Sequence, residues 1–473
     1  MDRAWLDELP EQAAPERPGG GRPRLRRPER RQVAWRAVSL DELVAADHRV
    51  RLVWRFVEGL DLAPLYARIK AVEGRPGHPP ADPRLLVALW LYATVEGIGS
   101  ARALARLCAE HLAFQWLCGG VGINHKTLSD FRLGHGALLE GLLVDSFAAL
   151  LKAGVASLER VPLRTDHRGR SWEPGKAQDG VRVRAAAGAA SFRRHTTLRA
   201  CQEQAAQVVQ RLRRALEADP AAVSRRQAAA RVAAAADRER RVAEALAITA
   251  ALHAASQARA RPRGERAAKN RKGDGGDGPP SAPAPTKEPR ASTTDPQARV
   301  MKMADGGFRP AYNVQFAADT RSGAVAGVAV DNLGSDRGRM APMNAALAAA
   351  YGTRPPQHLA DGGFAKLDDI ETLAQAGVVT YVPVPQPRDP TRDRHAARRD
   401  DSPAVAAWRQ RRATDEAKAI YRLRAATAEG VNAQARNRGL TRFLVRGIAK
   451  VKAVAIWSAL AHNMACSWRL ASA

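Results

Sequence analysis

Cysteine is scarce in this chain, and its few copies are scattered. The 473 residues contain four cysteines, Cys108, Cys118, Cys201 and Cys466, and no two of them form a CxxC pair. Zinc sites and disulfide frameworks need closely and regularly spaced cysteines, so we expect neither. Scattered thiols are typical of a protein that works in a reducing compartment.

Long hydrophobic runs are also absent. No apolar stretch reaches the roughly 18 residues that span a bilayer. The N-terminal residues are charged and proline-rich, without the apolar core of a signal peptide. We therefore expect a soluble, cytoplasmic protein with no membrane partner.

Acidic side chains are outnumbered by basic ones. Lys and Arg total 75 against 48 Asp and Glu, a formal net charge of +27 and a pI near 11. This surplus does not define a fold, but it favours a polyanionic partner, usually nucleic acid. A chain of this length has room for about two to four domains.

The first part of the chain changes character near residue 36. Residues 1–35 are basic and rich in Pro and Gly, which predicts a disordered arm. Residues 36–156 follow a helical pattern. Within them, Asp82 and Pro83 supply an N-cap and a first-turn proline for a helix that is apolar on most faces.

Two capped helices around a glycine-rich turn follow in the same region. Ser100 can cap the first, glycines break the chain at 119–122, and Asn124 can cap the second. This arrangement suits a helix-turn-helix that contacts DNA, although an ordinary helical hairpin remains the alternative. The candidate DNA contacts on the second helix are Lys126, Thr127, Ser129 and Arg132.

A long insertion interrupts the remaining fold. Residues 198–260 carry Ala, Arg, Gln and Glu at helical spacing, which predicts a helical hairpin with a solvated, basic outer face. Residues 261–295 are rich in Gly, Pro and Lys, and we expect a disordered linker there.

The last block predicts an α/β fold. Residues 311–319 and 324–331 are typical of two strands joined by a turn. Residues 357–361 and 378–385 read as strands on either side of a helix, so this second pair should be parallel. The chain then returns to helix over about 404–470.

The pentapeptide ADGGF occurs twice, at Asp305 and at Asp361. Asp361 ends a predicted strand before a crossover helix, where catalytic groups of open α/β sheets gather. Asp305 precedes a predicted hairpin, so we expect it only to shape a turn. Asp361 is the better candidate for chemistry.

Two further carboxylates are candidate partners for Asp361. Asp179 lies beside an alternating run that predicts a strand, and Glu429 lies in a predicted helix. Three such oxygen ligands suit Mg²⁺ or Mn²⁺, and two ions of this kind drive in-line displacement at phosphate. The alternatives are a generic Asp-Gly turn and a helical salt bridge.

Whole segments around these residues resemble the DDE transposases of bacterial insertion sequences. The similar segments are AQDGVRVRAAAGAASFRR, FRPAYNVQFAADTRSGAVAGVAVDNLGSDRGRMAPM, HLADGGF, YRLRAATAEGVNAQARNRGLTRFLVRG and ALAHNM. The N-terminal HPPADPRLLVALWLYATVEGIGSARALARLC resembles the family's helical DNA-binding domain. The resemblance covers about three quarters of the chain and omits the arm and much of 198–295.

The resemblance implies a ribonuclease-H-like mixed sheet with flanking helices, formed by 157–197 and 296–470. It also implies that the DNA-binding domain, 36–156, recognises the element's terminal inverted repeats. The enzyme would then cut and join strands of double-stranded DNA, both element ends and target, with no small-molecule substrate. A DNA-bound homodimer, Mg²⁺ (or Mn²⁺ in its place) and a bacterial, nucleoid-associated location follow from the same resemblance. The implied catalytic metal ligands are Asp179, Asp361 and Glu429, with Tyr421, Arg424 and Arg436 holding DNA.

Two departures from the family pattern bear on activity. The gap from Arg424 to Glu429 is one residue longer than usual, which on an α-helix turns one side chain away by about 100°. An extra segment, 162–176, precedes Asp179 and offers Asp166 as an alternative first carboxylate. An inactive remnant that only binds DNA is therefore the alternative to an active enzyme.

Overall fold

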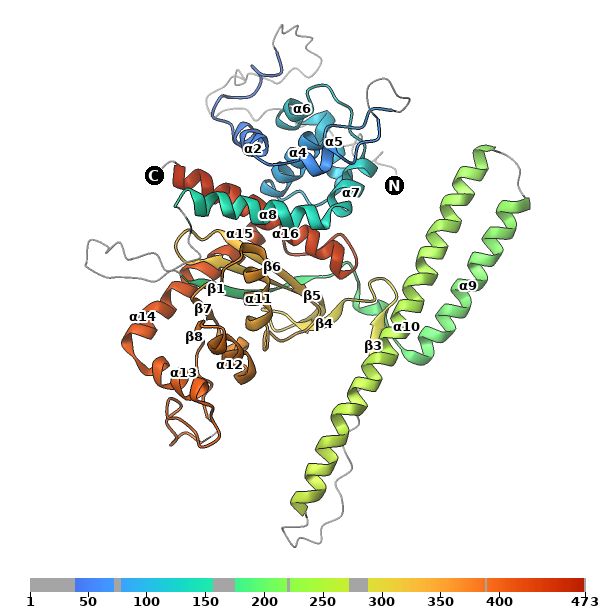
Figure 1. The fold of residues 1–473 in the computed structure, drawn as a ribbon. Helices are drawn as coiled ribbons and strands as arrows, with labels where there is room; N and C mark the ends of the chain where they lie inside the picture. Colours follow the sequence, from blue (N-terminus) through green and yellow to red (C-terminus); the bar gives the residue numbers. More distant parts are fainter. Residues whose placement is uncertain are drawn as a thin grey trace, which may run out of the picture. The chain divides into compact units, whose positions relative to one another are not determined.

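A computed structural model describes residues 39–71, 78–154, 156, 175–218, 222–271, 288–387 and 389–471 (Figure 1). The predicted arm 1–35, the alternative carboxylate Asp166 and most of the segment 162–176 lie outside these ranges. The chain divides into two units, Met1–Leu43 and Val44–Ala473, and all elements named below belong to the second.

Helices fill the N-terminal part of this unit, as predicted. The caps also match: the Asp82 carboxylate accepts from the Arg84 amide at 2.7 Å, and Asn124 accepts from Thr127 at 2.9 Å. One difference is a break at His111, whose ring caps a short additional helix. The helices are α2 (Arg49–Glu58), α3 (Ala63–Tyr66), α4 (Pro83–Val95), α5 (Ala101–Glu110), α6 (Leu112–Cys118), α7 (His125–Gly134) and α8 (Gly136–Lys152).

A mixed sheet of six strands forms the centre of the second half, and this confirms the α/β class. Its order is β4-β5-β1-β7-β8, with β6 also paired to β5. The β1 strand is antiparallel to β5 and parallel to β7, which is in turn parallel to β8. The strands are β1 (Lys176–Arg184), β4 (Arg299–Lys302), β5 (Phe308–Asp319), β6 (Val325–Asp331), β7 (Gln357–Ala360) and β8 (Val379–Tyr381).

Helices from the rest of the chain pack on this sheet. The strand β6 contacts α11 and α16, and β8 contacts α12 and α13. The α14 helix contacts β1, β7 and β8. These helices are α11 (Met340–Tyr351), α12 (Leu367–Gln375), α13 (Pro403–Ala413), α14 (Asp415–Arg424), α15 (Gly430–Asn437) and α16 (Ile448–Ala471).

One hydrophobic core connects the N-terminal helices to the sheet. It includes Trp90 of α4, Val183 of β1, Phe316 of β5 and Trp457 of α16, all buried. The Trp90 indole donates to the Leu128 carbonyl at 2.9 Å, which satisfies its polar group inside the core. The two regions are thus packed together rather than joined only by a linker.

The insertion between β1 and β4 is a helical hairpin on a small two-stranded ribbon. Helices α9 (His195–Ala218) and α10 (Ala222–Arg271) lie side by side (Figure 1). The strands β2 (Phe192–Arg194) and β3 (Arg290–Ser292) pair at their base. The predicted linker 261–295 is therefore wrong at both ends, because α10 continues to Arg271 and Ser292 is buried in β3.

In the described ranges, no single helix is both long and apolar enough to cross a bilayer. Only the pair α7 and α8, bent by 70°, has the length and composition of a span when the two helices are taken together.

Candidate active site

Asp179 lies inside β1, where it pairs with Phe316 of β5. Its side chain is 17% exposed, and one carboxylate oxygen accepts from the Asn432 amide of α15 at 3.0 Å. The other oxygen accepts from the backbone amide of Gly180 at 2.9 Å. The segment before β1 therefore does not detach Asp179 from its strand.

Asp361 follows the last residue of β7, as expected. The parallel register pairs Gln178 of β1 with Ala360 of β7, so Asp179 and Asp361 take the next position on two neighbouring strands. The Asp361 carboxylate caps a short 3₁₀ turn, Gly362–Phe364, by accepting from the Gly363 amide at 2.7 Å. Two carboxylates thus come to the same edge of the sheet.

Glu429 joins them through an arginine. The Arg424 guanidinium donates to Glu429 at 3.0 Å and lies 3.8 Å from an Asp179 oxygen. The Arg424 side chain is 13% exposed and that of Glu429 is 61% exposed, and the two contacts place the guanidinium between the carboxylates of Asp179 and Glu429. The three side chains form one charged cluster across β1 and the helical segment that contains Glu429.

The backbone between Arg424 and Glu429 explains this contact. Residues Ala425–Glu429 form a π-helical turn, in which residues five apart lie on one face. The expected rotation of about 100° assumed α-helical geometry, and it does not occur because the π-turn absorbs the additional residue. Arg424 and Glu429 therefore face each other.

Tyr421 faces the same cluster from α14. Its ring lies 5.6 Å from the Arg424 guanidinium carbon and 4.6 Å from that of Arg412. Burial raises the pKa of Tyr421, and the Asp361 carboxylate also raises it while both arginines lower it. Arg436, in contrast, is exposed on α15 and makes none of these contacts.

Burial and neighbouring negative charge both act on Asp179. Burial, followed by the carboxylates of Asp361 and Asp336, raises the pKa of Asp179 to about 6, against the lowering effect of Arg424 and of the Gly180 amide. A carboxylate in this position gains stability from any cation that approaches it. The clustered carboxylates therefore favour binding of a cation at this site.

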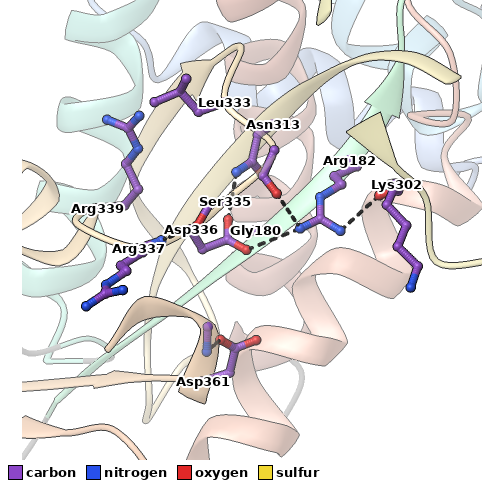
Figure 2. Close-up of polar contacts among 12 residues, drawn as sticks. Gly180, Arg182, Lys302, Asn313, Leu333, Ser335, Asp336, Arg337, Arg339 and Asp361 are labelled. Carbon is purple, nitrogen blue, oxygen red and sulfur yellow. Dashed lines mark hydrogen bonds and ion pairs between the residues drawn. The ribbon is translucent and has the colours of Figure 1, made fainter. Parts of the chain in front are cut away.

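Asp336 is a fourth acidic residue that the sequence analysis did not single out (Figure 2). One of its oxygens accepts from Asn313 and Gln315 of β5, each at 2.6 Å, and the other lies 3.9 Å from Arg182. Asp336 belongs to the loop between β6 and α11, and its sequence neighbours, NLGSDRGR, are typical of an ordinary polar turn. No local spacing distinguished it, because its amide partners come from another strand.

The donor chemistry of the cluster fits a hard divalent cation. Within the described ranges, no three His, Cys, Asp or Glu side chains stand as a ready-made cation site. Asp179, Asp361 and Glu429 nevertheless offer carboxylate oxygens, which Mg²⁺ and Mn²⁺ prefer. The buried Asn432 side chain adds an amide oxygen with no hydrogen-bond partner beside Asp179.

The candidate DNA contacts on α7 differ in exposure. Lys126 is 79% exposed and pairs with Asp130, while Thr127 and Ser129 are half-buried. Arg132 is buried, stacks over Trp90 at 4.3 Å and donates to the Gly99 carbonyl at 2.7 Å. Arg132 thus has a structural role, whereas Lys126 projects into solvent.

Comparisons with known proteins agree at both ends of the chain. Residues 38–133 match a family described as a transposase domain (DUF772), and residues 387–466 match a transposase DDE domain. No curated protein and no solved structure matched the chain. The second match contains Tyr421, Arg424 and Glu429, and the first contains all of α7 except its last residue.

Proposed function

We propose that this chain, an insertion-sequence DDE transposase, cuts DNA at the terminal inverted repeats of its element and joins the freed ends to target DNA. The single observation that carries the proposal is the cluster formed by Asp179, Arg424 and Glu429 beside Asp361. Residues from three separate parts of the chain meet there, and a turn aspartate or a lone helical salt bridge would not require this.

The proposed fold of the catalytic part, 157–197 and 296–470, is ribonuclease-H-like. Its support is the strand arrangement, in which an antiparallel hairpin flanks one side of β1 and two parallel strands flank the other. In such a sheet the carboxyl end of β7 faces the crevice that receives ligands. We assign 36–156 to DNA binding and 198–260 to an insertion.

The proposed metal ligands are Asp179, Asp361 and Glu429. These carboxylates would hold magnesium, which when bound would supply Lewis acidity for phosphoryl transfer to water or to a 3′-hydroxyl. Arg424 contacts both Asp179 and Glu429, offsets part of their negative charge and keeps both side chains turned toward the cluster. Mn²⁺ has the same ligand preference and is the expected substitute.

The neighbouring side chains hold the DNA strand. Arg424 and Tyr421 present a guanidinium and an aromatic ring beside the carboxylates, which suits a phosphate and an adjacent base. Arg436 adds an exposed charge one helix further on, and Lys126, Thr127 and Ser129 are the proposed contacts of α7. Pairing two element ends requires a homodimer on DNA, and the place of work is the bacterial nucleoid.

A strand-transfer assay tests this function. The full chain is incubated with end-labelled element-end DNA, a target plasmid and Mg²⁺, and products are resolved on a denaturing gel. We expect nicks at the element end and longer, joined strands. Nicks without joining would identify a nuclease, and binding without nicks would identify an inactive, DNA-binding remnant; either result would overturn the proposal.

A further inference from the structure

A groove of about 610 Å³ lies away from the carboxylate cluster. The start of α5 and the length of α7 from His125 to Leu133 form one side of it, and residues 237–244 of α10 form the other. Its floor comes from residues 295–297 and from 444–450 at the start of α16. The insertion hairpin therefore contributes a wall to a cavity that also contains the candidate DNA-reading helix.

The groove is lined mainly by positive charge. Two acidic side chains reach its surface, and Asp237 is already paired with two arginines of α10. A third acidic residue, Asp295, is fully buried and accepts from Tyr312 and from the Gly447 amide. The Lys and Arg side chains that line it are Arg102, Arg132, Arg240, Arg241, Arg446 and Lys450, of which Arg240 and Arg241 are the partners of Asp237.

Two of these cations come close from different elements. Burial lowers the pKa of Arg241, and the positive charge of Arg446 lowers it further. Arg241 belongs to α10, where it pairs with Asp237, and Arg446 belongs to the loop before α16, and both line the groove. Guanidinium groups that line one groove from different elements suit an anion with several oxygens, such as a phosphodiester.

The wall made by α10 is fixed relative to the sheet. Gln297 donates to Glu244 of α10 at 2.7 Å and accepts from the Ile448 amide of α16 at 2.7 Å. The Gln297 carbonyl also accepts from Asn332, which follows β6. A single residue thus ties the insertion to the sheet and to α16, and the spacing of the charges across the groove is set by the fold.

We propose that this groove holds a phosphodiester backbone of duplex DNA, with the inserted helix α10 as one wall of the DNA site. The inference rests on the proposed function for the identity of the polyanion. A peptide ligand would favour large aromatic anchors, and no Phe, Tyr or Trp side chain is among the described residues that line the groove. A DNA backbone needs only spaced cations.

Charge removal on both sides of the groove tests the inference. The full chain and the variant Arg240→Ala/Lys450→Ala are titrated with a fluorescent random-sequence duplex over a range of salt concentrations. Each lost phosphate contact lowers the slope of log Kd against log salt by about 0.9. We expect a slope lower by about 2 and, at low salt, an affinity at least about tenfold weaker.

A matched control separates this site from general loss of charge. Arg213→Ala/Arg214→Ala removes the same charge from exposed positions of α9 that do not line the groove, and its slope should remain at the wild-type value. Arg102→Ala, on the opposite wall, should lower the slope by about 1. Equal losses in the groove and control variants, or no loss in the groove variants, would overturn the inference.

The proposed function fails in a different way. Suppose that the wild-type chain nicks element ends and the groove variants bind DNA as tightly as the wild type. This result would contradict the inference about the groove and leave the proposed function intact. If the wild-type chain binds duplex DNA through the groove but does not nick it, the proposed enzymatic function would be wrong and the inference about the groove would stand. If polyglutamate, but not DNA, lost affinity in Arg240→Ala/Lys450→Ala, an acidic polypeptide would replace DNA as the ligand and the inference would be wrong.

Discussion

At the residue scale, a half-buried arginine lies between two of the cluster's carboxylates. Arg424 contacts Glu429 at 3.0 Å and approaches Asp179 to 3.8 Å, so each acid has a cationic neighbour before any metal or DNA is bound. Asp336 lies on the opposite face of β1, next to Gly180, and accepts hydrogen bonds from the side-chain amides of Asn313 and Gln315 of β5. The part of β1 around Asp179 and Gly180 thus has polar side chains on both faces.

Gly180 is the position where this polar packing tolerates no side chain. A methyl group there would lie 2.5 Å from an Asp336 oxygen and 2.6 Å from the Gln315 amide nitrogen. We expect Gly180→Ala to lower the free energy of unfolding by about 1–3 kcal/mol, the usual cost of overpacking. Chemical denaturation measures it.

The control for this substitution is Gly188→Ala. Gly188 has a negative φ of −89° and nothing within 4 Å of an added Cβ, so its replacement should change stability by less than about 0.5 kcal/mol. Equal stabilities of the two variants would show that the contact between Gly180 and Asp336 is not as close as described.

His358 predicts how stability responds to pH. Burial lowers the pKa of this fully buried histidine of β7 to about 4, below the ordinary value near 6.5. The unfolded chain therefore binds a proton that the folded chain resists, so stability is complete above about pH 6.5 and falls as pH drops toward 4. Denaturant midpoints measured between pH 7 and 4.5 test this.

The variant His358→Gln isolates that effect. It removes the titrating group and keeps a side-chain donor for Gln178, to which the His358 ring is hydrogen-bonded at 2.8 Å. We expect a shallower fall in stability with pH than in the wild type. His462, whose pKa burial also lowers to about 4, should retain part of the slope. An unchanged slope would contradict the account of His358.

At the scale of the element, the π-turn Ala425–Glu429 decides whether the arginine and the glutamate meet. Deleting Ala426 should convert it to an α-helical turn, in which residues four apart are also neighbours. We expect this deletion to retain DNA nicking within about tenfold of the wild-type rate. Inserting one alanine after Ala426 rotates Glu429 by about 100° and should reduce nicking by at least about a hundredfold.

Nicking of element-end DNA measures both changes. Equal activity of the insertion and the deletion would show that the contact between Arg424 and Glu429 does not matter for chemistry. Greater loss in the deletion would show that the π-turn has a role of its own.

Local patterns predicted the strands and most caps because those signals depend on neighbours in sequence. The alternation in β1, the β-branched run of β8 and the caps at Asp82, Ser100 and Asn124 are of this kind. Asp305 was also predicted correctly: it shapes the β4–β5 turn by accepting from Gly307. Asp361 was selected from the order of elements alone.

The sequence did not predict features that depend on distant partners. The π-turn lies between α14 and α15, and both helices pack against strands of the sheet. The strand β3 forms by pairing with β2, which is about 100 residues away in sequence. Asn432 and Asp336 have no local motif, since their partners lie on β1 and β5. The length of α10 was underestimated because Gly and Pro after residue 260 favoured a linker.

At the scale of the whole molecule, one core joins the N-terminal helices to the sheet. Trp457 of α16 lies in that core and its indole donates to the Arg132 carbonyl of α7. We expect Trp457→Ala to cost about 3–5 kcal/mol, as for other buried large aromatics. The helical region and the sheet should then lose structure in one shifted transition, followed by circular dichroism and by tryptophan fluorescence.

Separate transitions by the two probes would contradict that shared core. The helical region would then unfold independently of the sheet. The placement of α7 beside the groove would in that case no longer depend on α16.

The two ADGGF copies give the most direct test of the central claim, that the carboxylates at the edge of β1 and β7 perform the chemistry. Asp361→Asn and Asp305→Asn make the same change in the same pentapeptide, one in the cluster and one in an exposed turn. The measurement is nicking of element-end DNA with Mg²⁺, alongside DNA affinity. We predict at least about a thousandfold slower nicking for Asp361→Asn, Asp179→Asn and Glu429→Gln, with DNA affinity retained and Asp305→Asn unchanged. Wild-type nicking by Asp361→Asn, or equal losses in both copies, would contradict the account.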